Sequence, residues 1–151
     1  MSLRDKLLAC ITDDSIEFGV AVQHIESGEE TLINADAVFP TASVFKIPVL
    51  IELYKQVGEE KLGLDDLIRV TGYSKISGSG VLKELHSGLE VTIHDLATLM
   101  IIVSDNTATD LLLDLVGMDN VNQTLREIGL TQTKVAMSTR DLIFDIVAVK
   151  S

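Results

Sequence analysis

The hydrophobic pattern changes its period at Thr41, and this change limits the folds that the chain can adopt. Residues 16–23 alternate between apolar and polar side chains, which is typical of a half-buried strand. The turn residues ESGEE at 26–30 allow 31–38 to return as the second strand of a hairpin. Beyond Thr41, apolar residues recur at helical spacing. We therefore expect a mostly α fold with one small β-hairpin, whose sheet is incomplete because two strands alone are marginally stable in water.

This pattern predicts two parts, residues 1–40 and residues 41–151. The first part would hold a short N-terminal amphipathic helix and the hairpin. The second part would be a helical domain, in which Thr92 and Ser138 each precede an aspartate by three residues and so form capping boxes that open helices. The segment YSKISGSG at 73–80 predicts a flexible polar loop within this domain.

Composition argues against several classes of partner. The 12 lysines and arginines against 23 aspartates and glutamates give a formal net charge of -11, so a nucleic-acid backbone would be repelled. Apolar runs such as Leu99–Val103 are too short to cross the ~30 Å hydrocarbon core of a bilayer. The single cysteine, Cys10, cannot form an internal disulfide. Charged residues precede Leu7–Cys10 where a leader peptide would be apolar, so we expect a cytoplasmic protein or a mature exported one.

The charge of Lys46 is unusual for its surroundings, because it lies in the apolar helical stretch FPTASVFKIPVLIELY at 39–54. Ser43 precedes it by three residues, so on a helix the two side chains share one face, near enough for a neutral amine to take the hydroxyl proton. Burial and the positive end of the helix dipole both disfavour the charged amine. A helix start near Ser43 also leaves its backbone N–H free to stabilise an oxyanion, a second requirement of serine acyl transfer. The apolar residues of this stretch share one helical stripe: Val44, Ile47, Leu50, Ile51, Tyr54 and Val57.

A second polar cluster, Ser104-Asp105-Asn106, lies between two apolar helices. Helix capping by Asp105 or Asn106 explains one of its residues. Capping does not explain Ser104, whose hydroxyl could relay a proton to a leaving nitrogen, or the Asn106 amide, which could hold a substrate carbonyl. For Ser43 and Lys46 the alternative is a capping serine beside a lysine that extends to solvent.

Together, Ser43-x-x-Lys46 and Ser104-Asp105-Asn106 resemble the first two of three motifs of the class A serine β-lactamases and the related penicillin-recognising peptidases. The flanks FPTASVFKIPVLIELYKQ and GLEVTIHDLATLMIIVSDNTATDLLLDLVG are similar too, and the resemblance covers nearly the whole chain to Thr133. It implies the helical domain of the β-lactamase and transpeptidase-like α+β fold, with the first pieces of its α/β domain. It also implies a bacterial protein, periplasmic or secreted, that acts without a cofactor on a β-lactam or a D-Ala-D-Ala-like peptide.

The resemblance assigns roles to the residues of both motifs. It implies Ser43 as the acylated nucleophile and Lys46 as its proton acceptor or relay. Ser104 would shuttle a proton to the β-lactam nitrogen, and Asn106 would bind the side-chain amide of the substrate. Asp105 would be structural and hold the corner, and the loop at 77–80 would lie near the rim of the pocket.

Two parts of the family pattern are missing from this sequence. The third motif, Lys-Thr-Gly or Lys-Ser-Gly on a strand, is expected past Ser151. No glutamate of a deacylating loop follows Lys134, and helix capping explains Asp141, the conceivable substitute base. We therefore expect a piece of a longer enzyme or a shortened relative, whose uncovered apolar faces favour a homo-oligomer or association with a complementary part.

Three functions follow as hypotheses. The first is a serine β-lactamase-type hydrolase that works through a Ser43 acyl-enzyme. The second is a penicillin-binding or D-Ala-D-Ala peptidase-like protein that acylates without efficient turnover, and the third is a catalytically silent, oligomeric interaction module. Metal catalysis is not expected, because His24, His86 and His94 lie on unrelated elements without ligand spacing.

Overall fold

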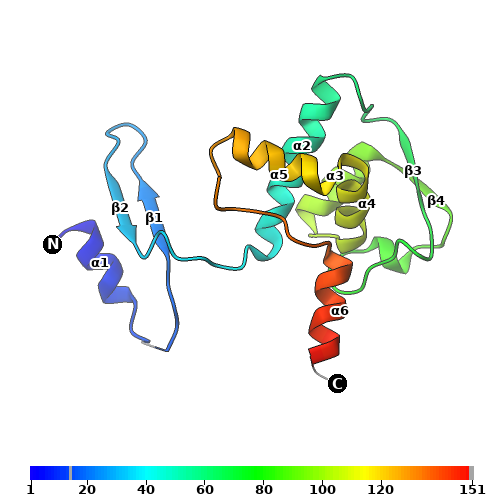
Figure 1. Ribbon diagram of the computed structural model, residues 1–151. Coiled ribbons are helices and arrows are strands. Elements are labelled where there is room, and N and C mark those ends of the chain that lie inside the picture. The colour runs from blue at the N-terminus through cyan, green and yellow to red at the C-terminus, as the bar shows by residue number, and fades with distance from the viewer. Residues whose placement is uncertain (14, 150–151) are drawn as a thin grey trace. The chain divides into compact units, whose positions relative to one another are not determined.

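The computed structural model describes residues 1–13 and 15–149 and contains two compact units, Met1–Pro40 and Thr41–Ser151 (Figure 1). The first unit holds helix α1 (Leu3–Cys10) and an antiparallel pair of strands, β1 (Val20–Gln23) and β2 (Glu30–Ile33). The predicted helix and hairpin are therefore present, with strands shorter than the alternating pattern suggested.

Local hydrogen bonds define the elements of the first unit. The Ser2 hydroxyl accepts the Asp5 N–H and the Asp5 carboxylate accepts the Ser2 N–H, which is a complete capping box at the start of α1. In the hairpin, Val20 pairs with Ile33 and Gln23 with Glu30. Arg4 donates from α1 to the carbonyl oxygen of Leu32, so the helix is tied to the second strand.

Helices make up most of the second unit, as the sequence predicted. In chain order its elements are the 3₁₀ helix η1 (Ala42–Phe45), α2 (Lys46–Gly58), β3 (Leu67–Val70), the 3₁₀ helix η2 (Leu82–Glu84), β4 (Leu89–Thr92), α3 (Ile93–Ile102), α4 (Asn106–Val116), α5 (Met118–Glu127) and α6 (Thr139–Val149). The capping box of Thr92 and Asp95 opens α3 as expected. The last helix was predicted to run nearly to Ser151, and its final two residues lie outside the described part of the chain.

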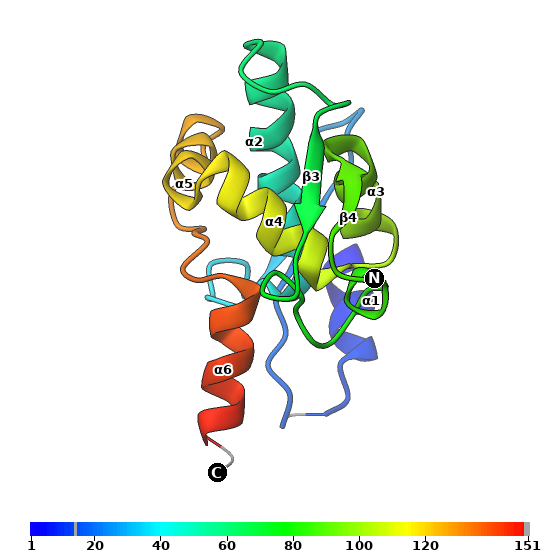
Figure 2. The ribbon, with the colours of Figure 1, turned by 90° about the vertical axis from the view of Figure 1, so that its right-hand side faces the viewer.

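The strand pair β3 and β4 was not predicted, because residues 64–70 were interpreted as a connecting segment. Leu67 pairs with Thr92 and Val70 with Leu89, in an antiparallel ladder. Val70 is fully buried, and Ile68 packs on the hydrophobic core beside it. Four residues are too few for a clear alternating pattern, so burial in the shared hydrophobic core rather than intrinsic strand preference accounts for this ladder. Figure 2 shows β4 next to α3, with β3 on the other side of β4.

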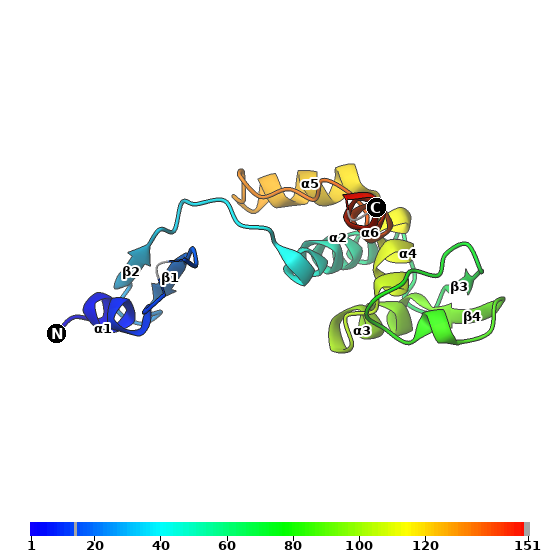
Figure 3. The ribbon, with the colours of Figure 1, turned by 90° about the horizontal axis from the view of Figure 1, so that it is seen from below.

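Helix α4 forms the centre of the second unit, between α5 on one side and the β3–β4 ladder on the other (Figures 1 and 3). Leu112 and Val116 on α4 are buried, and they share one core with Leu53 of α2, Met100 of α3 and Leu125 of α5. The capping residue Asp105 and the seven buried positions of α4 place the site motif directly on this core.

The face that α2 buries differs from the apolar stripe identified in the sequence. Val44, Ile47 and Tyr54 of that stripe are 63%, 51% and 48% exposed. The buried face carries Val49 and Leu53 together with three polar or charged residues, Lys46, Glu52 and Gln56. The apolar stripe of α2 therefore does not decide which face of the helix is buried, because the polar groups of the buried face find hydrogen-bond partners on neighbouring elements.

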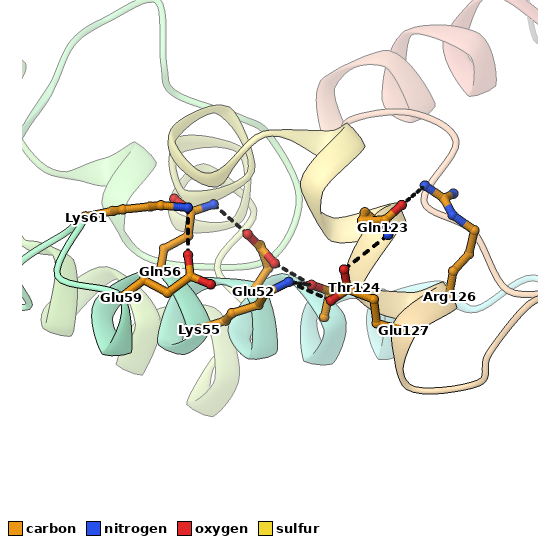
Figure 4. Close-up of polar contacts among 9 residues, drawn as sticks. All are labelled: Glu52, Lys55, Gln56, Glu59, Lys61, Gln123, Thr124, Arg126 and Glu127. Atoms are coloured by element: carbon orange, nitrogen blue, oxygen red, sulfur yellow. Dashed lines mark hydrogen bonds and ion pairs between the residues drawn. The ribbon is translucent and has the colours of Figure 1, made fainter.

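Glu52 is the centre of a buried polar network between α2 and α5 (Figure 4). Its Oε2 accepts a hydrogen bond from Thr124 Oγ1 at 2.5 Å, and its Oε1 accepts one from Gln56 Nε2 at 2.6 Å. Gln56 Nε2 also donates to the Val116 carbonyl oxygen at 2.9 Å. Both carboxylate oxygens of Glu52 thus have donors, which offsets the cost of burying the charge.

Lys55 extends this network towards solvent (Figure 4). Its Nζ donates to Thr124 Oγ1 at 3.1 Å and to Glu127 Oε2 at 2.7 Å. The hydrogen bond between the two charged groups raises the pKa of Lys55 and lowers the pKa of Glu127. Because both side chains are exposed, the pair itself contributes little to stability.

The network predicts unequal costs for two substitutions on α5. Thr124→Val keeps the side-chain shape but removes a donor from the buried carboxylate of Glu52, so it should lower the free energy of unfolding by about 2 kcal/mol. The control Glu127→Gln removes the charge of the exposed pair but keeps an acceptor for Gln123, so it should cost much less. Denaturant unfolding measures both, and equal losses would show that the buried network does not hold α2 to α5.

Candidate functional site

Ser43 lies in η1, the 3₁₀ turn that leads into α2, and its side chain is exposed. The sequence placed it at or near a helix start, and the helix does begin here, although with a tighter first turn than expected. The preceding residue, Ala42, has φ 44°. A non-glycine residue in this left-handed region is strained, and such strain persists where surrounding structure enforces it.

Lys46 begins α2, one turn after Ser43, and is only 3% exposed. Its Nζ donates to the Ser104 carbonyl oxygen at 2.8 Å, to Ser104 Oγ at 2.7 Å and to Asn106 Oδ1 at 3.2 Å. Three donors therefore meet three acceptors, two on Ser104 between α3 and α4 and one on Asn106, the first residue of α4. The two motifs, far apart in the sequence, form one hydrogen-bonded cluster.

Ser104 connects the lysine to the serine of η1. Its Oγ donates to Ser43 Oγ at 2.9 Å, while the same oxygen accepts from Lys46. Ser104 has φ 54°, the left-handed conformation again, in the break between α3 and α4. No direct hydrogen bond joins Lys46 to Ser43 among the described residues, so Ser104 lies on the hydrogen-bonded path between them.

Burial lowers the pKa of Lys46 below its ordinary value of 10.5, because the charged amine is removed from water. The carboxylates of Asp105 and Asp110 act in the opposite direction and partly restore the charged form. Desolvation is the larger of these effects. The neutral amine is thus easier to reach here than in an exposed lysine.

Asp105 is 1% exposed and caps α4 by accepting the Ala108 N–H at 3.0 Å. Its other oxygen, Oδ2, accepts the N–H groups of Val81 at 2.6 Å and Leu82 at 2.9 Å. Capping alone was one interpretation of this residue from the sequence. The geometry adds a second structural contact, because the carboxylate also fastens the loop that precedes η2.

Asn106 uses both ends of its amide. Its Oδ1 accepts from Lys46, and its Nδ2 donates to the Ser77 carbonyl oxygen at 2.9 Å. An amide nitrogen carries two hydrogens, so one N–H of Asn106 is not used in that bond. The backbone N–H of Asn106 donates to the Ser79 carbonyl oxygen at 3.1 Å.

The loop at 73–80 is held more firmly than its composition suggested. Every residue from Ile76 to Leu82 has a backbone N–H or C=O bonded to the 105–107 segment or to Lys83. The expected flexibility was inferred from glycine and serine content alone. The sequence Gly-Ser-Gly at 78–80 was the overlooked signal of an ordered turn. Gly80 has φ 107°, and a Cβ there would lie 2.3 Å from the Asp105 carboxyl carbon, so this position requires glycine.

Asp110 is a residue of this region that sequence reasoning missed. It is 4% exposed on α4, and its carboxylate accepts the N–H groups of Thr139 at 2.8 Å and Arg140 at 3.0 Å, which start α6. Asp141, considered above as a base, accepts a hydrogen bond from the Ser138 hydroxyl at 2.7 Å, and its backbone N–H donates to the same hydroxyl. Such contacts are those of a helix start.

Comparison with known proteins identifies the family. Residues 2–148 match the model of the Beta-lactamase enzyme family. The chain belongs to this family. It is 34% identical over 113 residues to Beta-lactamase L2 of Stenotrophomonas maltophilia, a match that covers 74% of this chain and 37% of that protein.

Solved structures of the beta-lactamase family resemble the fold closely. A beta-lactamase from Sphaerobacter thermophilus superposes with a TM-score of 0.78 at 40% identity, over 81% of this chain and 46% of the other. A mutant of PBP-A, as an acyl-enzyme complex with penicillin G, gives a TM-score of 0.77 at 30% identity, over 82% and 47% of the two chains. The fold is therefore confirmed as that of the helical part of this family, and the chain spans less than half the length of the curated relatives it matches.

Other kinds of site find no support in the described residues. Within 1–13 and 15–149, no three His, Cys, Asp or Glu side chains lie close enough to hold a metal ion. No helix in this range is long and apolar enough to cross a membrane.

The close approach at Gly80 gives a test of the corner. Gly80→Ala combines a strained positive φ with a collision against the Asp105 side chain and backbone, so it should lower the free energy of unfolding by roughly 2–3 kcal/mol. Gly129→Ala is a matched control, because Gly129 has φ 90° but open space around it, and it should cost only about 1 kcal/mol. Denaturant unfolding compares the two, and equal costs would mean that the loop is not fixed against Asp105.

Proposed function

We propose that Ser43 is a nucleophile that opens β-lactams by forming an acyl-enzyme. The observation that supports this most is the continuous hydrogen-bonded path from Ser43 Oγ through Ser104 Oγ to the buried amine of Lys46. A capping serine beside a lysine that extends to solvent would not produce this path. The family membership supports the same chemistry.

The proposed step transfers one proton along this path. As the bonds stand, Lys46 donates to Ser104 and Ser104 donates to Ser43, which is the polarity of a charged lysine. With a neutral lysine the polarity reverses, so that Ser43 gives its proton to Ser104 and Ser104 gives its own to Lys46. Ser43 Oγ then bonds to the lactam carbonyl carbon and the ring C–N bond breaks. Ser104 donates a proton to the leaving nitrogen and is reprotonated by Lys46.

Two further groups would bind the substrate. The backbone N–H of Ser43, in the first turn of η1, is proposed as a donor to the developing oxyanion. The unused N–H of Asn106 is proposed as the donor to the side-chain amide carbonyl of the substrate. Asp105 would keep its structural role at the corner.

Release of the acyl group distinguishes two versions of this function. Hydrolysis would make the protein a β-lactamase, whereas slow release would make it a penicillin-binding or D-Ala-D-Ala peptidase-like protein. Glu127 is the last glutamate of the sequence, and it pairs with Lys55 on α5. The likeness to a mutant of PBP-A, solved as an acyl-enzyme complex with penicillin G, supports the second version as the alternative function.

Activity, location and assembly of the whole protein are also proposals, because the matched regions cover only 37% and 46% of two curated relatives. We propose a bacterial enzyme of the periplasm or the exterior. The exposed apolar residues of α2 and α3 favour a homo-oligomer or association with a complementary part of the fold. A catalytically silent interaction module is the contrasting hypothesis. A covalent penicillin adduct on Ser43 would exclude it, and the absence of any adduct would favour it.

Intact mass after exposure to penicillin G tests the nucleophile. One covalent adduct should form, and Ser43→Ala should abolish it. Ser74→Ala is a matched control, because this exposed-loop serine bonds only Thr71 and should leave the adduct unchanged. An adduct that decays within minutes indicates the hydrolase and a persistent one the penicillin-binding protein. No adduct, or an adduct that survives Ser43→Ala, would contradict the proposal.

The lowered pKa of Lys46 predicts how acylation depends on pH. Only the neutral amine accepts a proton, so the acylation rate should rise with pH and reach its midpoint below 10.5. Asp110→Asn removes a carboxylate that favours the charged form, and should move the midpoint to lower pH. Lys46→Arg, which does not lose its proton in this range, should acylate poorly at every pH.

The same shift affects stability. Between the folded pKa and 10.5 the unfolded chain binds more protons at Lys46, so the free energy of unfolding should increase with pH in that window. Below the folded pKa the charged amine bears its full burial cost.

For the kinetic prediction, an acylation rate that does not change with pH, or an acylation midpoint above pH 10.5, would contradict the assignment of Lys46 as base.

A further inference from the structure

Lys83, in η2, reaches back to the turn that precedes it in the chain. Its Nζ donates to the Gly78 carbonyl oxygen at 2.6 Å and to the Gly80 carbonyl oxygen at 3.0 Å. Hydrogen bonds from an ammonium are roughly twice as strong as neutral ones. The lysine therefore joins two carbonyls of the turn at residues 77–80, which contains two glycines.

Successive carbonyls of this turn are divided between Lys83 and Asn106. The oxygens of Ser77 and Ser79 accept from the side chain and the backbone of Asn106, at 2.9 Å and 3.1 Å. The oxygens between and after them, those of Gly78 and Gly80, accept from Lys83. Positive φ at Gly78 and Gly80 gives the backbone the conformation in which neighbouring carbonyls have different partners.

We propose that Lys83 is a positioning residue for Asn106, acting through the turn at residues 77–80. The turn supplies the acceptor that orients the Asn106 amide, and Lys83 fixes the turn. This inference rests on the proposed function only for its effect on catalysis, since the placing of Asn106 is a property of the fold. Without Lys83 the acceptor of Asn106 would shift, and the amide N–H proposed to bind substrate would lose its direction.

Amide hydrogen exchange measured by NMR on the ¹⁵N-labelled chain tests the positioning. The Asn106 amide, which donates to Ser79, reports on the turn directly. In Lys83→Met its exchange should accelerate about tenfold or more, the effect expected when a hydrogen bond from a charged group is lost. Lys83→Arg should restore most of the protection. Lys75→Met is the matched control, since Lys75 lies in the same loop but donates to the Leu85 carbonyl oxygen, and it should leave Asn106 unchanged.

Unchanged exchange at Asn106 in Lys83→Met, or equal acceleration in Lys75→Met, would overturn the proposal. If Lys83→Met also accelerates the core amide of Leu112, global unfolding is the cause and Lys83→Gln decides instead. Gln keeps a neutral donor, so Asn106 should then exchange at an intermediate rate while Leu112 stays protected. Exchange equal to the unsubstituted chain in Lys83→Gln and in Lys83→Ala would contradict the role.

Acylation kinetics give the second readout. The penicillin concentration at half-maximal acylation rate should rise severalfold in Lys83→Met, because the Asn106 amide N–H is the proposed substrate donor. The limiting rate should change less, since Lys46 keeps its two acceptors on Ser104. A lower limiting rate with an unchanged half-saturating concentration would contradict the proposal that Lys83 positions Asn106 for substrate binding. If the unsubstituted chain forms no adduct, the proposed function fails, and the exchange experiment still decides whether Lys83 positions the turn.

Discussion

The second unit depends on one buried amine. Lys46 lies almost fully out of water, and a charge in that position is costly unless it is hydrogen-bonded. The break between α3 and α4 supplies two of its acceptors, both on Ser104, and the first residue of α4, Asn106, supplies a third. The start of α2 and this break are therefore held together, and Ser43 is placed within reach of Ser104. The strained backbone of Ala42 and Ser104 is the conformational cost of the arrangement.

Two buried aspartates interact electrostatically with the amine and also hold the backbone of neighbouring segments. Asp105 caps α4 and holds the loop before η2. The Asp110 carboxylate accepts hydrogen bonds from two backbone N–H groups at the start of α6. Both aspartates raise the pKa of Lys46 against the larger effect of burial. Backbone N–H groups bonded to these carboxylates stabilise their charges inside the fold. Structure and electrostatics at this corner thus come from the same side chains.

Local patterns in the sequence predicted most of the helices, the hairpin and the family. The shift at Thr41, the capping box at Thr92 and the motif residues sufficed for the helices, the hairpin and the family, since each leaves a local pattern. Features that depend on contacts between distant residues were not predicted. The β3–β4 ladder is too short to show alternation, and the buried face of α2 is set by Glu52 and its partner Thr124 rather than by apolar content. Nothing local to Asp110 announces that it caps a helix 29 residues later.

Within the beta-lactamase family this chain corresponds to the part that carries the proposed nucleophile and relay. The proposed acylation depends on the amine of Lys46 losing its proton below the ordinary pKa of 10.5. NMR titration of the Lys46 side chain, observed at Cε and Nζ, measures this most directly. We expect a pKa below the ordinary 10.5 in the folded protein, which rises towards that value when the protein unfolds. A Lys46 that titrates at or above 10.5 in the folded protein would contradict it.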